Sequence, residues 1–261
     1  MRVIAIQAAQ AGGEVLMQHF GRLTQIEEKH LGGLVTEADR NSEQTIVEAI
    51  RSTFPRHDVL AEENTYAAEG SPYKWIIDPL DGTTNFAHSF PWFAISIALE
   101  VEGELVLGVI YNPVSGEMFV AEKGQGAFLN DQPIKVSTVD SLEQSLLATG
   151  FPYDRKISEV NNYDHFITFQ QAAQACRRPG AAALDLACVA AGRFDGYWEM
   201  KLKPWDVAAG KLLVEEAGGT VTDFKGTPCD IYGTETLASN GQIHDTMLEL
   251  LSRGATATSA E

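Results

Sequence analysis

Two closely spaced aspartates, Asp78 and Asp81, are the first residues in the chain that could do chemistry. The run 74–78 predicts a strand that ends at Asp78, so Asp78 would lie where the chain leaves a sheet. Pro79 fixes its own φ and has no N–H, which predicts a sharp turn that brings Asp81 back towards Asp78. Two such carboxylates need a positive charge between them. Hard oxygen ligands without a convergent Cys or His favour Mg²⁺ over Zn²⁺.

The residues after Asp81 suit an anion. Gly82 permits an unusual backbone angle or the close approach of a ligand. If a helical turn starts here, the amides of Gly82 and Thr83 would point outward, where phosphate oxygens bind readily. Taken alone, however, the segment is equally compatible with a turn in which Asp81 caps a short helix.

Two further acids lie beside apolar segments elsewhere in the chain. Glu62 is near the end of the strand-like run 59–63, and Asp206 begins a predicted helix that ends at Glu216, before two glycines. An aspartate at a helix N-terminus is usually a cap. Three apolar segments that each meet an acid, with no basic cluster opposite them, are harder to explain as three separate caps. The combination favours a shared site.

The elements that must position these acids fall into two blocks. The first block has predicted helices at 2–20 and 39–54, followed by an antiparallel meander of strands at 59–63, 74–78, 93–100, 104–112, 117–124, 126–130 and 134–137. The second has strands at 145–150, 194–200, 220–224 and 236–240 and helices at 156–174, 181–191, 206–216 and 241–253. This grouping predicts the α+β class, with layers in place of a simple βαβ repeat. We expect one domain over 1–261, with halves at about 1–140 and 141–253 and a flexible tail at 254–261.

The bulk composition excludes several classes of protein. The chain has 261 residues, of which 44% are hydrophobic and 21% charged, so it can bury a sizeable core. Acids outnumber bases 36 to 19, and a net charge of −17 argues against binding to nucleic acid or an anionic membrane. No apolar run is long enough to span a membrane. The three cysteines form no CxxC pair, so we expect reduced thiols and a cytoplasmic protein.

Five motifs, in order along the chain, resemble the inositol monophosphatase family. They are "LVTEAD" (34–39), "AEE" (61–63), "WIIDPLDGTTNFAHSFPWFAISIAL" (75–99), "GAAALDLACVAAGRFDGYWEM" (180–200) and "WDVAAGKLLVEEAGG" (205–219). The ending "GTTNF" is similar to inositol monophosphatases proper, whereas 3′-phosphoadenosine phosphatases carry a Lys-Glu version of the segment. The resemblance implies a layered α/β/α/β/α sandwich of the inositol monophosphatase and fructose-1,6-bisphosphatase type, and a homodimer.

The resemblance also implies a set of metal ligands. By similarity, a first Mg²⁺ would be held by Glu62, Asp78 and the backbone carbonyl of Leu80. A second would be held by Asp78, Asp81 and Asp206, and a looser third site would share Glu62. Family analogy adds inhibition by Li⁺. Two departures bear on the third metal and on the substrate pocket, because Gly33 stands where the family has Asp and Ala181 where it has a small hydroxyl residue.

Catalytic and substrate roles follow from the same resemblance. Glu62 and Thr83 would position and deprotonate the attacking water, and Asp39 would accept a hydrogen bond from Thr83. Substrate contacts are implied for Asp81, Gly82, Thr83, Glu199 and Asp206.

The implied reaction is Mg²⁺-dependent hydrolysis of a phosphate monoester, with myo-inositol monophosphate as the first candidate and a small phosphorylated polyol or sugar as the class. A phosphate dianion could approach four clustered carboxylates only after divalent cations reverse their charge. Two alternatives stay open. One is a broader sugar-phosphate phosphatase, with fructose-1,6-bisphosphatase, histidinol-phosphatase or NADP phosphatase activity. The other is a non-catalytic interaction protein on the same fold.

Overall fold

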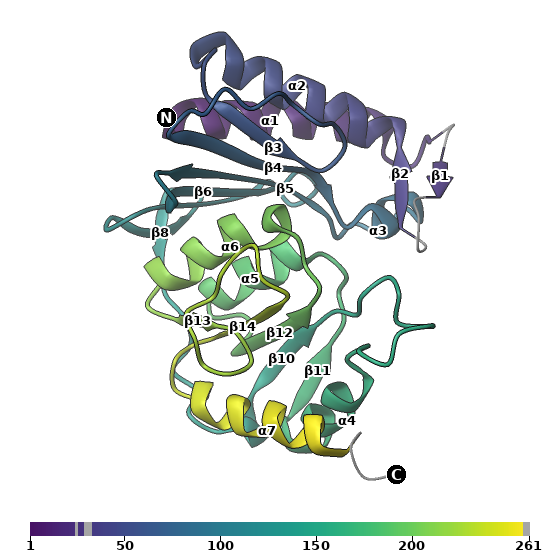
Figure 1. Cartoon of the computed structure of the whole chain (residues 1–261), viewed down its shortest axis with the longest axis vertical. Coiled ribbons are helices and arrows are strands. Elements are labelled where there is room, and N and C mark those ends of the chain that lie inside the picture. Colours follow the sequence, from purple (N-terminus) through teal and green to yellow (C-terminus); the bar gives the residue numbers. More distant parts are fainter. Residues whose placement is uncertain (24–25, 29–32, 258–261) are drawn as a thin grey trace.

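Helices and sheets alternate in five layers (Figure 1). The computed structural model describes residues 1–23, 26–28 and 33–257, and of 253–257 it describes the backbone alone. From one side to the other, the layers are α1 (Arg2–His19) with α2 (Glu37–Thr53), a seven-stranded sheet, α5 (Ala182–Ala190) with α6 (Pro204–Glu216), a five-stranded sheet, and α4 (Tyr163–Ala172) with α7 (His244–Ala257). The expected α/β/α/β/α sandwich is confirmed.

The seven-stranded sheet places three of the predicted acids, Glu62, Asp78 and Asp81, at the C-terminal ends of its first two strands. Its order is β3 (Asp58–Ala61), β4 (Tyr73–Asp81), β5 (Ala94–Val101), β6 (Glu104–Asn112), β7 (Glu117–Glu122), β8 (Gly126–Leu129) and β9 (Gln132–Ile134). From β4 to β9 the strands form the predicted antiparallel meander, but β3 pairs with β4 in parallel. The meander prediction is therefore wrong for this first pair. Because Ala61 lies opposite Ile77, Glu62 leaves β3 beside Asp78.

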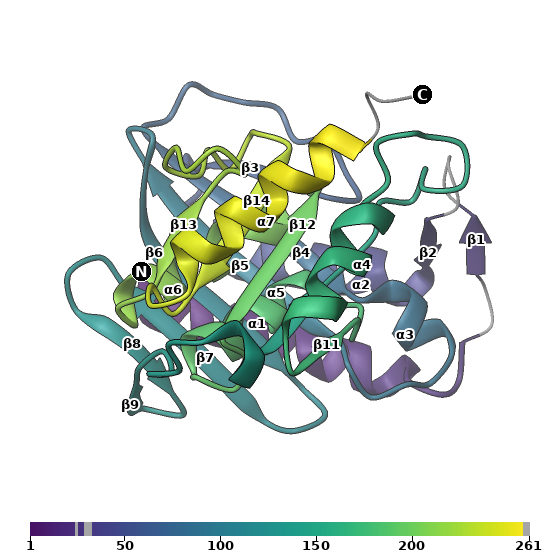
Figure 2. The ribbon, with the colours of Figure 1, turned by 90° about the horizontal axis from the view of Figure 1, so that it is seen from below.

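The five-stranded sheet is mixed. Its order is β11 (Ala175–Arg177), β10 (Leu146–Thr149), β12 (Gly196–Met200), β14 (Glu235–Ser239) and β13 (Thr220–Thr222). The strand β10 runs parallel to both of its neighbours, and β14 runs antiparallel to both of its own. Seen from below, α4 and α7 cross its outer face (Figure 2). Strand β11 was not predicted.

One predicted helix is wrong over its first third. Residues 156–162 are not helical, and α4 begins only at Tyr163. Before it, Asn162 has a left-handed φ of 74° and is buried. Its side-chain amide donates to the carbonyl of Gly150 at 2.6 Å, and its Oδ1 accepts from the indole N–H of Trp198 at 2.9 Å. A tertiary anchor thus replaces the helical turn that local sequence favoured.

Other short elements differ at their ends. The hairpin of β1 (Ile26–Glu28) and β2 (Leu34–Thr36) was not predicted. Helix α7 begins at His244, three residues later than expected, and continues to Ala257. Residues 254–257 of the expected flexible tail therefore belong to this helix, and 258–261 lie outside the described residues.

The side chains of β4 alternate between two cores. Trp75 and Ile77 pack in the core under α1 and α2, whereas Ile76 packs in the core formed with α5 and α6. All nine residues of α5 are buried, and all but Asp185 are apolar, as expected for a helix between two sheets. Within the described chain, no helix is long and apolar enough to cross a membrane.

Candidate active site

The two aspartates of the opening motif lie in a single strand. Strand β4 continues to Asp81, and its pairing with β5 shifts between Asp78, opposite Ser96, and Asp81, opposite Ala94. The expected strand end at Asp78 is therefore wrong, because a β-bulge inside the strand makes the turn. Pro79 is tolerated there since a bulge interrupts the ladder of N–H donors.

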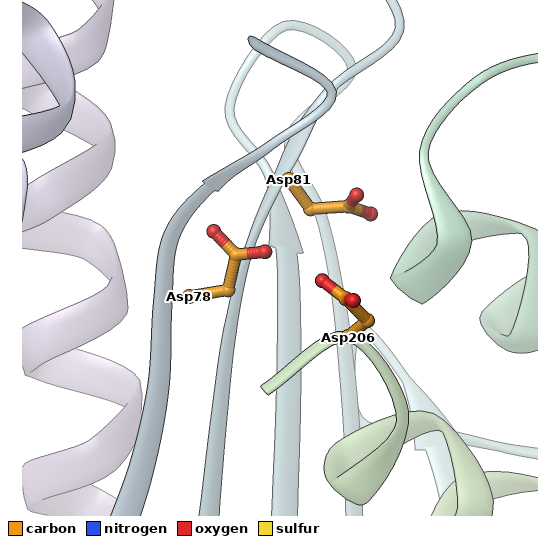
Figure 3. Close-up of side chains that lie close together, drawn as sticks. All are labelled: Asp78, Asp81 and Asp206. Carbon is orange, nitrogen blue, oxygen red and sulfur yellow. The ribbon is translucent and has the colours of Figure 1, made fainter. Parts of the chain in front are cut away.

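A third aspartate arrives from the layer of helices between the sheets. Asp206 lies in the first turn of α6, where its Oδ2 accepts the backbone N–H of Lys203 at 2.7 Å. One carboxylate oxygen each of Asp78, Asp81 and Asp206 lies within 4.8 Å of the others. Figure 3 shows the three side chains pointing toward one another from the two segments. The structure thus brings together three of the predicted metal ligands.

Glu62 lies close to this cluster without being one of its three members. It follows β3 at the edge where Asp78 lies, and its negative charge is a cause of the raised pKa of both Asp78 and Asp206. The fifth predicted ligand, the carbonyl of Leu80, lies within the bulge, and the N–H of Leu80 donates to Asp78 Oδ1 at 2.9 Å.

The electrostatics of the cluster call for a cation. Burial and the charge of Glu62 hold the pKa of Asp78 far above its ordinary value, and Asp206 shows the same direction for the same two causes. Burial raises the pKa of Asp81 to about 7, although two backbone N–H groups oppose the shift. Among the ion pairs of the described residues, none involves these three aspartates. Oxygen donors of this kind fit Mg²⁺.

Asp81 also joins the two halves of the chain. Its carboxylate accepts the N–H groups of Ala182 at 3.2 Å and of Ala183 at 2.8 Å, at the start of α5. The N-cap residue of α5, Ala181, has no side-chain capping bond of its own. Asp81 is thus a helix cap as well as a member of the cluster, but it caps a helix one hundred residues away.

The residues after Asp81 turn sharply into the short helix α3 (Thr83–Ala87). Gly82 has φ 92°, and a Cβ there would lie 3.0 Å from the carbonyl oxygen of Trp92, so a larger residue would be strained twice over. The first N–H groups of a helix have no partner within it. The amides that the sequence predicts for phosphate therefore lie at a helix start beside the acidic cluster.

The predicted hydrogen bond between Thr83 and Asp39 is present. Thr83 Oγ1 lies 3.1 Å from Asp39 Oδ1 and also 3.1 Å from the carbonyl oxygen of Leu80. Asp39 in turn accepts from the N–H of Thr36 at 2.8 Å and from its hydroxyl at 2.6 Å. Burial raises the pKa of Asp39 to about 6. A fully buried carboxylate therefore holds the threonine hydroxyl in place.

Glu199 comes to the site from the second sheet. The hydroxyl of Tyr197 donates a short hydrogen bond to Glu199 Oε2. Burial raises the pKa of Glu199 to about 7, and its charge in turn raises that of Asp81. A Cβ on Gly150 would lie 2.1 Å from both carboxylate oxygens of Glu199, so only glycine leaves room for this group.

Two buried residues of α2 were missed by the sequence reasoning. Ser42 and Glu43 lie one turn after Asp39, on the same helix face, and each binds the backbone of a segment that carries a predicted ligand. The available signal was their spacing of three and four residues from Asp39. Polar residues at core-facing positions usually have a specific partner.

Comparison with known proteins shows which family has this fold and sequence. The model of the inositol monophosphatase family matches residues 1–255. The chain belongs to the inositol monophosphatase family. Over 95% of its length it is 47% identical to Inositol-1-monophosphatase of Synechocystis, 87% of which is covered. It is also 48% identical to Nus factor SuhB of Pseudomonas aeruginosa, over 86% of this chain and 85% of that protein.

Solved structures agree on the fold. Inositol monophosphatase from Anabaena (Nostoc) superimposes with a TM-score of 0.87 and 47% identity, covering 96% of this chain and 94% of that one. Relatives of similar identity thus carry two kinds of name, one for a phosphatase and one for a Nus factor. Membership in the family is shown, and the choice between these roles is a separate question.

Proposed function

We propose that this protein is a Mg²⁺-dependent phosphatase that hydrolyses myo-inositol monophosphate to inositol and phosphate. The observation that carries the proposal is the cluster of Asp78, Asp81 and Asp206, whose carboxylate oxygens lie within 4.8 Å of one another. The identity of 47% to a protein named Inositol-1-monophosphatase supports the substrate.

The proposed cation ligands are Glu62, Asp78, the carbonyl of Leu80, Asp81 and Asp206. Two or three Mg²⁺ ions held there would neutralise the cluster, lower the pKa of a water molecule and stabilise the leaving alkoxide. The raised pKa of Asp78 and of Asp206 reflects how strongly the protein alone disfavours these charges together. No basic side chain of the described part pairs with the three aspartates, so the compensation is left to a ligand.

The remaining residues bind and orient the reactants. Amides of Gly82 and Thr83 hold the phosphate, since they lie at the start of α3 and the first N–H groups of a helix have no partner within it. The hydroxyl of Thr83, held by Asp39, orients the attacking water together with Glu62. Asp206 and Glu199 face the hydroxyls of the alcohol. Water attacks phosphorus directly, and no covalent enzyme intermediate is required.

A substrate panel tests this proposal. Purified protein would be assayed for phosphate release from myo-inositol 1-phosphate, fructose 1,6-bisphosphate, histidinol phosphate and NADP, with and without Mg²⁺. We expect Mg²⁺-dependent turnover that is highest on the inositol phosphate and is inhibited by Li⁺. A higher kcat/KM on one of the other three substrates would replace the inositol phosphate assignment with that of a broader sugar-phosphate or NADP phosphatase. The absence of turnover on all four would reject the phosphatase proposal.

A second candidate is a non-catalytic role as a Nus factor. It is favoured by the 48% identity to Nus factor SuhB of Pseudomonas aeruginosa. The test is complementation of a Pseudomonas strain that lacks its own protein, with the wild type and with Asp81→Asn. Rescue by both would establish a role that does not need the acidic cluster. Failure of the wild type would reject this candidate and leave the phosphatase proposal standing.

A further inference from the structure

Three buried residues of α2 each hold a different segment of the acidic site. Asp39 binds the hydroxyl of Thr83, at the start of α3. The hydroxyl of Ser42 donates to the carbonyl of Pro79 at 3.0 Å, inside the bulge of β4. Glu43 binds the segment that follows β3. These three side chains are completely buried. One helix face therefore contacts all three chain segments that approach the site from the first sheet.

Glu43 makes the most extensive of these contacts. Its Oε2 accepts the backbone N–H of Glu63 at 2.8 Å. Its Oε1 lies 3.0 Å from the backbone nitrogen of Asn64, 2.8 Å from the side-chain amide of Asn64 and 3.0 Å from the hydroxyl of Tyr66. A buried carboxylate that lacks a cation is stable when several donors satisfy it. These donors belong to one short stretch of chain, so the carboxylate fixes the path of that stretch.

The position of this clamp connects it to the metal site. The N–H of Glu63 belongs to the same planar peptide unit as the carbonyl of Glu62. Holding that N–H sets the peptide plane directly after Glu62, at the point where the chain bends out of β3. Because Glu62 is the last residue before the stretch that Glu43 holds, releasing Glu63 and Asn64 would let the backbone of Glu62, and with it the Glu62 carboxylate, shift relative to Asp78 and Asp206.

We propose that Glu43 is a positioning residue that aims Glu62 at the divalent cation. The inference rests on the proposed function, because it assumes that Glu62 is a cation ligand. Residues that orient metal ligands typically change metal affinity or activity by about 10–100-fold when they are replaced. A glutamate that only stabilised the fold would change the free energy of unfolding and leave the affinity of the folded protein for Mg²⁺ unaltered.

The same loop supplies a matched control at its other end. Asp58 is buried at the start of β3 and accepts the N–H groups of Glu69 at 2.7 Å and of Ser71 at 3.1 Å. It is a second acidic clamp on the segment between β3 and β4. Glu62 lies four positions further along the chain, which is about 13 Å at the usual rise of a strand. Asp58→Asn therefore perturbs the loop far from the site.

The experiment compares Glu43→Gln, Asp58→Asn and Glu48→Gln, the last an exposed glutamate on the same helix. Titration calorimetry would measure the binding of Mn²⁺ and Mg²⁺, and urea unfolding would measure stability. Hydrogen exchange would measure the protection of the backbone amides of Glu63 and Asn64. In Glu43→Gln we expect metal binding about 10-fold weaker and faster exchange at both amides. Asp58→Asn should lose stability with unchanged metal affinity, and Glu48→Gln should match the wild type. Equal metal affinity in Glu43→Gln and Asp58→Asn would overturn the proposal.

Two further results separate this inference from the proposed function. Tyr66→Phe removes one donor to Glu43 without touching the backbone, so it covers the case in which Glu43→Gln does not fold. We expect it to weaken metal binding about 2-fold to 3-fold, and an unchanged affinity would count against the clamp. A wild type that binds Mg²⁺ in a Glu43-dependent way but releases no phosphate would support the clamp and reject the phosphatase. Phosphatase activity together with a Mg²⁺ affinity that is the same in the wild type and in Glu43→Gln would support the phosphatase and reject the clamp.

Discussion

Acidic residues gather at both ends of helix α6, but the two groups differ in whether basic side chains pair with them. At the N-terminal end, Asp206 meets Asp78 and Asp81, and none of the three has an ion-pair partner among the described residues. At the C-terminal end, a cavity of about 470 Å³ is lined by five acids and two lysines. They are Glu100, Glu104, Glu215, Glu216, Asp230, Lys123 and Lys211.

The acids of the C-terminal end have partners. Lys211 Nζ lies 2.9 Å from Glu215, one helical turn away, and Lys123 Nζ lies 2.6 Å from Glu104. Glu216 accepts the N–H groups of Gly124 at 2.7 Å and of Gly126 at 2.8 Å. The protein therefore satisfies these charges itself. Backbone N–H groups bind acids at both ends, so neither a count of acids nor a hydrogen bond separates a metal site from a structural cluster. The difference is that lysines lie among the acids of the C-terminal end and pair with Glu104 and Glu215.

The largest expected effect is the loss of activity in Asp206→Asn. Removing this ligand should lower Mg²⁺-dependent phosphate release by about 1000-fold, which corresponds to several kcal/mol of lost charge stabilisation. Without Mg²⁺ the variant should be more stable than the wild type, because one of several crowded buried charges is gone. Calorimetric Tm with and without Mg²⁺ and a phosphate-release assay would measure both.

The matching change at the other end is Glu215→Gln. It removes a carboxylate that already has a lysine partner, so activity and Mg²⁺ affinity should equal those of the wild type. If Asp206→Asn kept near-wild-type turnover, or if Glu215→Gln lost it, the distinction between the two ends would be wrong.

Thr83→Val should lower kcat by about 100-fold, because the hydroxyl that orients the attacking water is lost. The side chain keeps its shape, so Mg²⁺ binding should change little. Steady-state kinetics at saturating Mg²⁺, with metal binding measured separately by calorimetry, would test this. A change confined to Mg²⁺ affinity would instead place Thr83 in the metal site alone.

The stability of the metal-free protein should depend on pH through its N-terminal cluster. The pKa of Asp81 rises from an ordinary 3.8 to about 7 in the folded state. A carboxyl with a raised pKa binds its proton more tightly when folded, so its contribution to stability is present below about pH 4 and is lost as the pH rises to 7. Urea unfolding in EDTA from pH 4.5 to 7.5 should show a steeper decline for the wild type than for Asp81→Asn. Equal slopes would mean that Asp81 ionises normally.

Gly150→Ala should alter the alcohol side of the pocket. The new Cβ would lie 2.1 Å from the carboxylate of Glu199, which must move away. Losing one hydrogen bond from a charged group should raise KM for the polyol phosphate about 10-fold. Affinity for inorganic phosphate should stay the same, and inhibition by phosphate provides that control. Parallel losses for both ligands would indicate a general disturbance of the site.

The sequence was most informative where chemistry and local pattern coincide. The spacing of Asp78 and Asp81 and the helix start at Asp206 predicted the cluster that the structure assembles. The bulge in β4 was not predictable, because it depends on the register with β5, and the parallel pairing of β3 depends on a crossover outside any local window. Residues 156–162 are not helical as predicted, because Asn162 is held by hydrogen bonds to Gly150 and Trp198, which lie far away in the sequence. Long-range partners decided each of these cases.

The smallest expected effect is that of Lys211→Met at the C-terminal end of α6. Its pair with Glu215 spans one helical turn and is partly exposed, and such pairs contribute about 0.3–0.5 kcal/mol. Loss of the lysine leaves Glu215 and Glu216 near the negative end of the helix dipole, so the variant should be slightly less stable than the wild type. This loss of stability should be smaller in high salt, which screens the charges. Urea unfolding at two ionic strengths would measure this. Mg²⁺ affinity at Asp206, at the opposite end of the helix, should not change. A change in Mg²⁺ affinity greater than about 2-fold would show that the two ends are coupled through α6. The ion pair of Lys211 with Glu215 would then have to be treated as part of the metal site.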